Sequence, residues 1–369
     1  MSNRAATLLD AYFRDLEAQD LYSGVVLITR GAETCFAGAY GYASRAWRIR
    51  PTPATRFDTA SVTKLFTAVA TLQCVDAGLI ALDTPVVEYL DLVGTAISPA
   101  VTVAQLLTHS SGIGDDCEEE AGERYEDLWR TRPNYAVTTT TDFLPQFVHK
   151  PPNFPPGQGC RYCNCGYILA GLVIEKATGL AYREVIQERI FAPVGMANSG
   201  FLWMDRVYPN VAEGCDPLHD ESGNIVGWKR NIYAFPPIGS PDSGAYVTAG
   251  DLDRFLRAVI AGKLLSPAST QAFLTPQVPY QQRPGGETRY GYGPVFLTQD
   301  DRVIWLQKEG INAGVSAVIR HYPGQNLNVV LLSNLEDGVW RPLKEVHERV
   351  IAGDFLGVSI GGDPNSARP

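Results

Sequence analysis

Strand-forming patterns lie near both ends of this chain, and they limit its possible folds more than any other feature. Residues 23–30 and 33–40 predict two strands joined by the turn Gly31-Ala32, so an antiparallel hairpin is expected. Three further strands are predicted for residues 303–308, 314–320 and 326–333. Helical periodicity dominates most of the sequence between the two groups. The sequence therefore predicts an α+β fold in which one antiparallel sheet is formed from N- and C-terminal segments, flanked by helices, with an inserted mainly helical region.

This order of elements predicts two regions. Residues 1–85 and 240–369 would form the α/β sheet domain, and residues 86–239 would form the inserted helical domain with lid-like loops. Residues 117–156 change from acidic to polar to Pro-rich, which is typical of an insertion packed over a site or of a mobile lid. Residues 205–241 carry several Gly and Pro residues and are expected to be mostly loop.

Charge and composition exclude several classes of partner. The formal net charge of −9 disfavours nucleic acid and anionic membranes as partners, so a small-molecule substrate is expected. No apolar run reaches membrane-spanning length, and residues 1–16 show an amphipathic helical pattern rather than a signal peptide. A cytoplasmic location is therefore expected, unless a leader was removed. The oligomeric state does not follow from the sequence.

One segment carries the residues of a nucleophilic site. Ser61-Val62-Thr63-Lys64 precedes apolar residues at helical spacing, which predicts a buried helix that begins near Ser61. Lys64 then lies one turn from Ser61 on the same face. Lowering the pKa of a lysine from about 10.4 to near 7 requires about 4 kcal/mol, which only a nearly dry pocket supplies. The simpler alternative is a Ser helix cap followed by an exposed Lys.

Two further motifs suit the same chemistry. In Tyr162-Cys163-Asn164 the phenol can relay a proton and the amide can hold a carbonyl group. In Lys308-Glu309-Gly310, at a predicted strand end, the glycine allows a ligand to approach the backbone closely. Taken singly, the first motif is equally compatible with a turn and the second with a surface strand end.

Together and in this order, the three motifs resemble the S-x-x-K, Y-x-N and K/H-x-G motifs of the serine β-lactamase and penicillin-binding-protein superfamily. The resemblance covers roughly residues 20–335. Within the superfamily, the chain is most similar to the class C branch, which includes family VIII carboxylesterases, D-aminopeptidases and related amide hydrolases. It implies the β-lactamase/transpeptidase-like fold. The segments that carry it beyond the motifs are residues 55–64, 82–85, 106–113, 156–162 and 243–252.

The resemblance also implies roles for the motif residues. Ser61 would be the acylated nucleophile, Lys64 its base, and Tyr162 the second proton-transfer group. Lys308 would supply positive potential that lowers the pKa of Tyr162 and Lys64, and Asn164 would help to bind the acyl group.

The third motif would also complete the oxyanion hole and affect substrate choice. The backbone N–H groups of Ser61 and Ile311, beside Gly310, would form the oxyanion hole. Glu309 stands where β-lactam-recognising members often carry Thr or Ser, and its charge would repel a substrate carboxylate unless strand alternation points it away.

The expected function is that of a serine hydrolase that needs no metal or cofactor and hydrolyses small esters through an acyl-enzyme on Ser61. Amide hydrolysis by the same residues (β-lactamase, D-aminopeptidase or small-amide hydrolase) and acyl transfer are the enzymatic alternatives. A catalytically silent penicillin-binding-like sensor is the non-enzymatic one.

Two competing sites are weaker. A Ser-His-Asp triad lacks a G-x-S-x-G elbow, and none of the five histidines stands in a triad context; His109 is expected to be a structural hydrogen-bonding residue. Cys160, Cys163 and Cys165 suggest zinc, but no fourth ligand lies at suitable spacing, so small buried thiols are expected instead.

Overall fold

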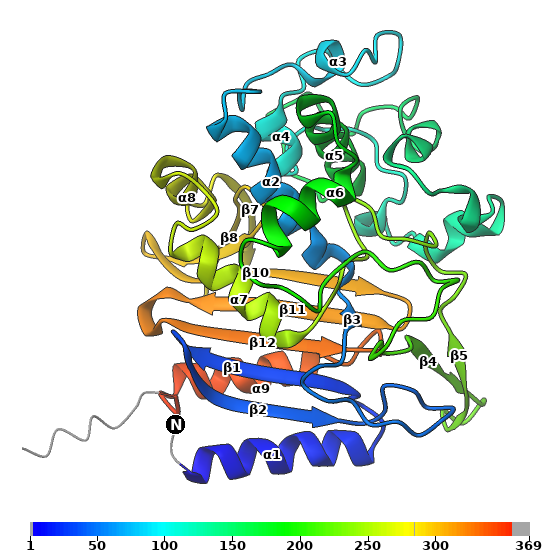
Figure 1. Ribbon diagram of the computed structural model, residues 1–369, viewed down its shortest axis with the longest axis vertical. Coiled ribbons are helices and arrows are strands. Elements are labelled where there is room, and N and C mark those ends of the chain that lie inside the picture. Colours follow the sequence, from blue (N-terminus) through cyan, green and yellow to red (C-terminus); the bar gives the residue numbers. More distant parts are fainter. Residues whose placement is uncertain (1–2, 284, 356–369) are drawn as a thin grey trace, which may run out of the picture.

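Eight antiparallel strands form the main sheet of the computed structural model, which describes residues 3–283 and 285–355 (Figure 1). Their order across the sheet is β2-β1-β12-β11-β10-β9-β8-β7. The strands are β1 (Gly24–Arg30), β2 (Glu33–Tyr40), β7 (Val278–Arg283), β8 (Gly286–Tyr290), β9 (Val295–Gln299), β10 (Arg302–Asn312), β11 (Val315–Tyr322) and β12 (Leu327–Ser333).

The pairing of β1 with β12 joins the two ends of the chain. Val26 lies opposite Leu331 and Ile28 lies opposite Val329, and all four side chains are buried. These strands carry apolar residues on both faces because helices cover both sides of the sheet. The predicted fold class, with a sheet built from N- and C-terminal segments and the hairpin β1–β2, is confirmed.

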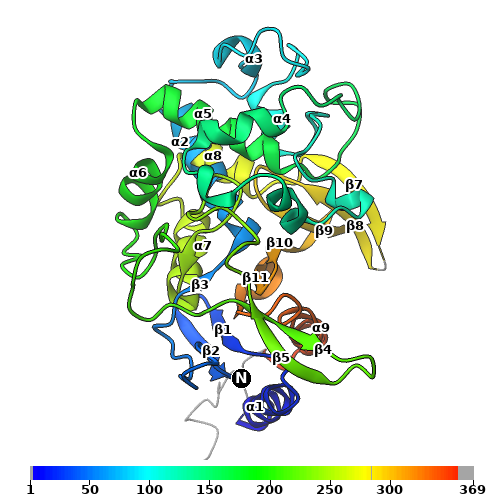
Figure 2. The same cartoon turned by 90° about the vertical axis from the view of Figure 1, so that its right-hand side faces the viewer.

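Helices cover both faces of the sheet (Figure 2). On the first face, α1 (Asn3–Ala18) and α9 (Trp340–Ile351) pack against β1, β11 and β12. The helices of the second face are α2 (Lys64–Asp76), α7 (Ala249–Ile260) and α8 (Pro267–Phe273).

A mainly helical region lies at the end of the molecule opposite α1 (Figure 1). Its elements are α3 (Val86–Tyr89), α4 (Val103–Leu107), α5 (Asn164–Thr178), α6 (Tyr182–Ile186) with a π-turn at Gln187–Phe191, and the 3-10 turns η2 (Glu119–Ala121), η3 (Tyr125–Arg130), η4 (Asn134–Ala136) and η5 (Thr140–Gln146). This agrees with the expected helical insertion. The division into residues 1–85 with 240–369 and residues 86–239 stays a prediction.

The helix predicted to begin near Ser61 is α2, and it is buried over most of its surface. The α-helix itself begins at Lys64, three residues later than expected. Ser61 lies in a 3-10 turn, η1 (Ala60–Thr63), that runs directly into α2. The turn is fixed from behind by a short ladder between β3 (Phe57–Asp58) and β6 (Tyr246–Val247).

The expectation that residues 205–241 are mostly loop is confirmed, but a short hairpin within them was not predicted. They contain a separate hairpin of β4 (Cys215–His219) and β5 (Ile225–Arg230). Its outer residues are mostly exposed, so it has little of the apolar alternation that predicts strands. The guanidinium of Arg45 lies 3.4 Å from the centroid of a Trp228 ring and attaches the hairpin to a distant segment.

The described helices include none that combines the length and apolar character needed to cross a membrane. The first two residues of the predicted N-terminal helix and the chain after residue 355 lie outside the described residues.

Candidate active site

The three sequence motifs meet in one cleft between η1, the N-terminus of α5 and strand β10. Ser61 Oγ accepts hydrogen bonds from Lys64 Nζ at 3.1 Å and from the Tyr162 hydroxyl at 2.6 Å. The Nζ atom of Lys308 lies 4.8 Å from the centroid of the Tyr162 ring, and that of Lys64 lies 4.9 Å from it. The sequence expectation that these four residues converge agrees with this geometry.

The turn that presents Ser61 has an unusual backbone. Ala60 has a φ of 42°, in the left-handed region that costs a residue with a Cβ roughly 1–2 kcal/mol. The Asp58 carboxylate accepts a hydrogen bond from the Ala60 N–H at 2.7 Å, and Thr59 bonds the Ala245 carbonyl through both its N–H and its hydroxyl. These contacts hold the strained turn in place and fix the direction of the Ser61 side chain.

Lys64 is fully buried, and its Nζ has three oxygen neighbours. Besides Ser61 Oγ, it donates to Asn164 Oδ1 at 2.7 Å and to the Asp242 carbonyl at 2.9 Å. Burial lowers the pKa of Lys64, and the negative charge of Asp242 partly opposes this. The nearly dry pocket that a lysine base requires is therefore present.

Asn164 contacts the lysine rather than open space in the cleft. Its Oδ1 accepts a hydrogen bond from Lys64 Nζ at 2.7 Å. This contact positions the Lys64 amine, and the expected role of Asn164 in acyl binding stays a prediction.

Asp115, which the sequence reasoning missed, caps the helix that begins with Asn164. Its carboxylate accepts the backbone N–H groups of Asn164 at 2.8 Å and of Cys165 at 2.9 Å. A carboxylate at a helix N-terminus satisfies unpaired N–H groups and complements the helix dipole. Nothing in the sequence pairs Asp115 with a helix that begins 49 residues later.

The pKa of Tyr162 differs from expectation. Burial raises it well above its ordinary value, and the nearby Glu119 charge raises it further, whereas the positive potential of Lys308 was expected to lower it. Tyr162 is therefore a neutral phenol at pH 7. Its hydroxyl group therefore donates a hydrogen bond to Ser61 Oγ.

Lys308 is buried on β10, and its pKa falls to about 7, first because of burial and second because of the Lys64 charge. The Glu309 carboxylate opposes this shift. Glu309 itself is exposed at the cleft border, where it accepts a hydrogen bond from Gln307 Nε2 at 2.8 Å. Because Glu309 binds the residue two positions earlier on the same strand face, its side chain alternates with that of Lys308.

Gly310 is required by close packing. A Cβ built on Gly310 would lie 2.1 Å from the Thr59 carbonyl oxygen and 2.8 Å from the Ser61 nitrogen. The strand therefore approaches the Ser61 turn as closely as two backbones can. Ile311 follows at the border of the cleft with 45% of its surface exposed.

The cleft around Ser61 contains about 1280 Å³ of empty space, including space open to solvent. Four tyrosine or tryptophan side chains and charges of both signs surround it. Its lining residues are Ser61, Glu119, Glu120, Tyr162, Tyr280, Arg283, Thr288, Tyr290, Val295, Trp305, Gln307, Lys308, Glu309, Ile311 and Arg320.

The acidic part of the segment 117–156 reaches this cleft. Glu119 and Glu120 belong to η2 and line it. The Glu120 carboxylate accepts the Tyr162 N–H at 2.9 Å and the Tyr280 hydroxyl at 2.8 Å, and so connects the helical region to the sheet. The sequence indicated a segment over a site but identified neither glutamate.

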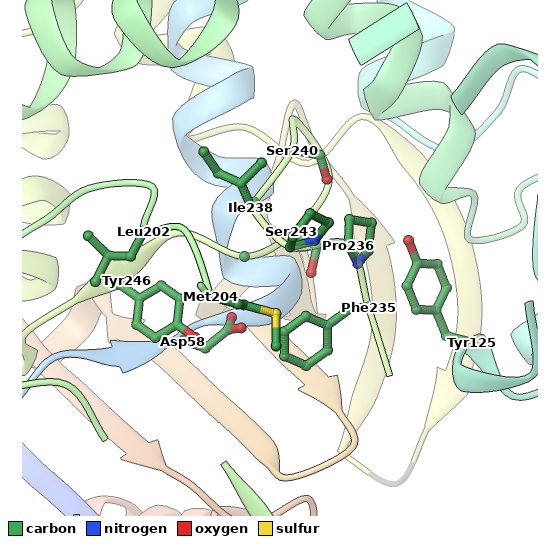
Figure 3. Close-up of a pocket in the computed structure, with 13 residues that line it drawn as sticks. Asp58, Tyr125, Leu202, Met204, Phe235, Pro236, Ile238, Ser240, Ser243 and Tyr246 are labelled. Atoms are coloured by element: carbon green, nitrogen blue, oxygen red, sulfur yellow. The ribbon is translucent and has the colours of Figure 1, made fainter. Parts of the chain in front are cut away.

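A second, smaller pocket lies behind the Ser61 turn (Figure 3). It contains about 330 Å³ of empty space, and its walls are mostly apolar, with the Asp58 carboxyl group near Met204, Phe235 and Tyr246. Burial raises the pKa of Asp58 to about 6. Ser61 does not line this pocket, so the larger cleft is the candidate active site.

The cysteine and histidine expectations have structural counterparts. Cys163 and Cys165 are buried free thiols as expected, whereas Cys160 is a free thiol that is only partly buried. Cys163 Sγ caps α5 by accepting the Gly166 N–H. Asp115, Asp116 and Cys165 lie close enough to share an ion, but the Asp115 carboxylate already accepts backbone N–H groups through both oxygens. His109 Nδ1 accepts the Cys163 N–H at 3.1 Å, which confirms its structural hydrogen bond.

Comparisons with known proteins agree with this geometry. The family model described as Beta-lactamase matches residues 9–352. Penicillin-binding protein 4 of Amycolatopsis lactamdurans is 28% identical over 353 residues, which cover 90% of this chain and 86% of that protein. Esterase EstB of Burkholderia gladioli is 29% identical over 324 residues, which cover 80% of each. The crystal structure of a penicillin binding protein from Bacillus halodurans matches with a TM-score of 0.83 at 37% identity, and the match covers 90% of this chain and 99% of that one.

Proposed function

The chain belongs to the beta-lactamase family, and from that membership and the cleft geometry we propose that it is a serine hydrolase that forms an acyl-enzyme on Ser61 and hydrolyses small esters. The observation that carries this proposal is that Ser61 Oγ lies within hydrogen-bond distance of both Lys64 Nζ, at 3.1 Å, and the Tyr162 hydroxyl, at 2.6 Å. A serine hydroxyl becomes a nucleophile when one neighbour takes its proton and another supplies a proton to the leaving group.

The partners of Lys64 support its role as the base. A neutral amine has two N–H groups and one lone pair. Asn164 Oδ1 and the Asp242 carbonyl can only accept, so they take both N–H groups of the neutral amine. The lone pair is then left for the hydroxyl of Ser61, and in acylation Lys64 takes that proton as Ser61 Oγ bonds to the substrate carbonyl carbon.

Tyr162 and the adjacent backbone complete the proposed cycle. The neutral phenol of Tyr162 protonates the departing alkoxide, and the proton held by Lys64 later restores the phenol. The Ser61 and Ile311 N–H groups would stabilise the oxyanion, which is consistent with the close approach of Gly310 to the Ser61 nitrogen. In deacylation the same groups transfer protons between water and Ser61 Oγ.

The test compares Ser61→Ala with the wild-type protein on p-nitrophenyl acetate and butyrate. We expect the variant to lose essentially all turnover, whereas the exposed hairpin variant Ser222→Ala should keep it. Intact-mass spectrometry after fluorophosphonate treatment should show one adduct on the wild type and none on Ser61→Ala. Ester turnover by Ser61→Ala at the wild-type rate would refute the proposal, and a wild type without adduct or turnover would favour the silent sensor.

Amide hydrolysis is a second candidate, favoured by Glu119. Its carboxylate lines the cleft together with Ser61 and is close enough to Lys64 and Tyr162 to affect their pKa values. A substrate that carries an ammonium group near the scissile carbonyl would find its counter-charge there. Turnover of amino-acid amides, nitrocefin and neutral esters, compared between wild type and Glu119→Gln, separates the two. Added alcohols or amines would reveal acyl transfer in the products.

We also propose that the protein works in a reducing compartment such as the cytoplasm. All seven cysteines are free thiols, which suits such a compartment better than an oxidising one.

A further inference from the structure

His109 contacts the segment around Tyr162 in three ways. Its carbonyl accepts the Arg161 N–H at 2.9 Å, and its Nδ1 accepts the Cys163 N–H at 3.1 Å. Its ring lies against the Tyr162 ring, with a centroid distance of 4.6 Å and an angle of 34°. His109 thus contacts the residue before Tyr162, the residue after Tyr162 and the side chain of Tyr162.

The backbone of His109 makes this possible. It follows α4 and has a φ of 56°, in the left-handed region. In that conformation, the carbonyl group and the imidazole ring of His109 both accept hydrogen bonds from the neighbouring segment 161–163. Asn adopts this conformation more readily than most residues with a side chain, which makes it the suitable conservative replacement.

The environment of the ring fixes its chemical state. It is 1% exposed and packs against Tyr167 and Tyr290 as well as Tyr162. Because Nδ1 accepts a hydrogen bond, the neutral ring carries its proton on Nε2. Burial, with the charges of Lys308 and Lys64, lowers the pKa of His109 well below its ordinary value. The ring therefore stays neutral and remains a hydrogen-bond acceptor for the chain next to Tyr162.

The proposed chemistry depends on the 2.6 Å contact between the Tyr162 hydroxyl and Ser61 Oγ. The other hydrogen bond at Tyr162 itself, from its N–H to Glu120, fixes the backbone but not the plane of the ring. The ring of His109 packs against the Tyr162 ring, which the Lys64 and Lys308 amines also contact, so it helps to restrict how that ring can tilt.

We propose that His109 is a positioning residue that holds the Tyr162 hydroxyl at Ser61, an inference that rests on the proposed function of the cleft. His109 does not line the cleft around Ser61, and it acts through the backbone on either side of Tyr162 and through the Tyr162 ring.

Three variants test this. His109→Ala removes the ring and its acceptor, whereas His109→Asn keeps an acceptor at the position of Nδ1 and tolerates the backbone. His321→Asn is the control, because His321 is also buried and bonded through Nδ1, to Asn328 on the sheet. Displacing a proton-transfer group by about 1 Å costs about 100-fold in rate.

For ester turnover we expect kcat of His109→Ala to fall by about 10- to 100-fold while KM changes less than about threefold. His109→Asn should fall between His109→Ala and the wild type, and His321→Asn should keep the wild-type kcat. A crystal structure of His109→Ala should show the Tyr162 hydroxyl beyond hydrogen-bond distance from Ser61 Oγ. Circular dichroism gives the folded fraction, to which kcat is normalised.

Normalised kcat at the wild-type value in His109→Ala would overturn the inference, as would an unmoved Tyr162 hydroxyl in its crystal structure. If His109→Ala does not fold, His109→Asn decides through the ring contact that it removes: a lowered kcat supports the inference, and an unmoved Tyr162 hydroxyl in its crystal structure overturns it. Failure of the proposed function would be recognised separately, because the wild type and Ser61→Ala would then show equal turnover. In that case the position of Tyr162 in the crystal structure would still test the inference.

Discussion

Two buried lysines share the cleft, and they differ in the hydrogen-bond partners around the nitrogen. Lys64 has three oxygen neighbours, whereas Lys308 lies over the face of the Tyr162 ring. Because the two charges repel each other and both are buried, one cation is favoured over two. When Lys64 takes the proton of Ser61, it becomes a cation next to Lys308, whose own pKa is about 7.

This arrangement predicts a pH profile. The folded pKa of Lys308 is lowered to about 7, so its charge is nearly complete only well below pH 7, is half lost near pH 7 and is lost further as the pH rises. If charged Lys308 is needed for the oxyanion, kcat/KM should fall above that pH. Lys308→Arg keeps its charge at all working pH values and should remove the alkaline decrease, because arginine does not lose its proton.

The measurement is kcat/KM for p-nitrophenyl butyrate between pH 5 and 10 in the wild type, Lys308→Arg and Lys308→Met. Lys308→Met should be slow throughout, by about 100-fold or more. An alkaline decrease in Lys308→Arg that matches the wild type would contradict the assignment.

The residues of the site divide into those that local sequence can indicate and those that it cannot. Ser61 and Lys64 lie one turn apart, so helical periodicity alone places them together. Glu119 and Asp115 reach the same cluster through the tertiary fold, and no local pattern separates them from other acidic loop residues. The raised pKa of Tyr162 was also beyond the sequence, because it depends on burial and on the Glu119 charge.

At the scale of secondary structure elements, the site depends on how closely strand β10 approaches the turn η1. Gly310 sits where the two backbones meet, and the atoms that a side chain would meet are backbone atoms, which cannot rotate away. Any side chain at this position would push the strand from the Ser61 turn and move the proposed oxyanion hole.

Gly310→Ala should therefore lower kcat by about 100-fold or more, the effect of losing one oxyanion donor. Gly324→Ala is the matched control, since a Cβ at Gly324 has nothing within 4 Å, and it should keep wild-type kcat. Both variants are assayed on p-nitrophenyl butyrate, with urea unfolding as the check on folding. A Gly310→Ala protein with wild-type kcat would show that the close approach does not matter.

Elements with a strong apolar pattern were predicted, and elements held by tertiary contacts were not. Strands β1, β10, β11 and β12 have continuous apolar runs because both of their faces are covered. Strands β7, β8 and β9 extend the sheet at its edge with more exposed and polar residues, and they were missed. The α-helix after Ser61 was placed correctly, but its 3-10 beginning depends on Asp58 and on the β3–β6 ladder.

At the scale of the whole molecule, the two chain ends form one folding unit because β1 and β12 are neighbours in the sheet. Val26 and Leu331 are fully buried cross-strand partners that are distant in sequence. The order of elements predicted this closure, since strands at both ends leave few other ways to bury their apolar faces.

A double-mutant cycle on Val26→Ala and Leu331→Ala tests this unit. Leu331→Ala alone should cost about 2–5 kcal/mol of unfolding free energy. The two substitutions should couple by about 0.5–3 kcal/mol because the side chains share one site. The control cycle pairs Val26→Ala with Leu169→Ala on α5, at the far end of the molecule, and should be additive. Urea unfolding gives each value, and additivity in the first cycle would contradict the shared unit.

The pairing of the first strand with the last also has a consequence for biosynthesis. During translation, β1 leaves the ribosome about 300 residues before its partner β12, a delay of about 15–60 s at typical elongation rates. Ser61 and Tyr162 are made early, but Lys308 is added only shortly before the sheet can close. The nascent chain must therefore wait, with its first hairpin unpaired on one edge, and it gains its complete cleft only when synthesis is nearly finished.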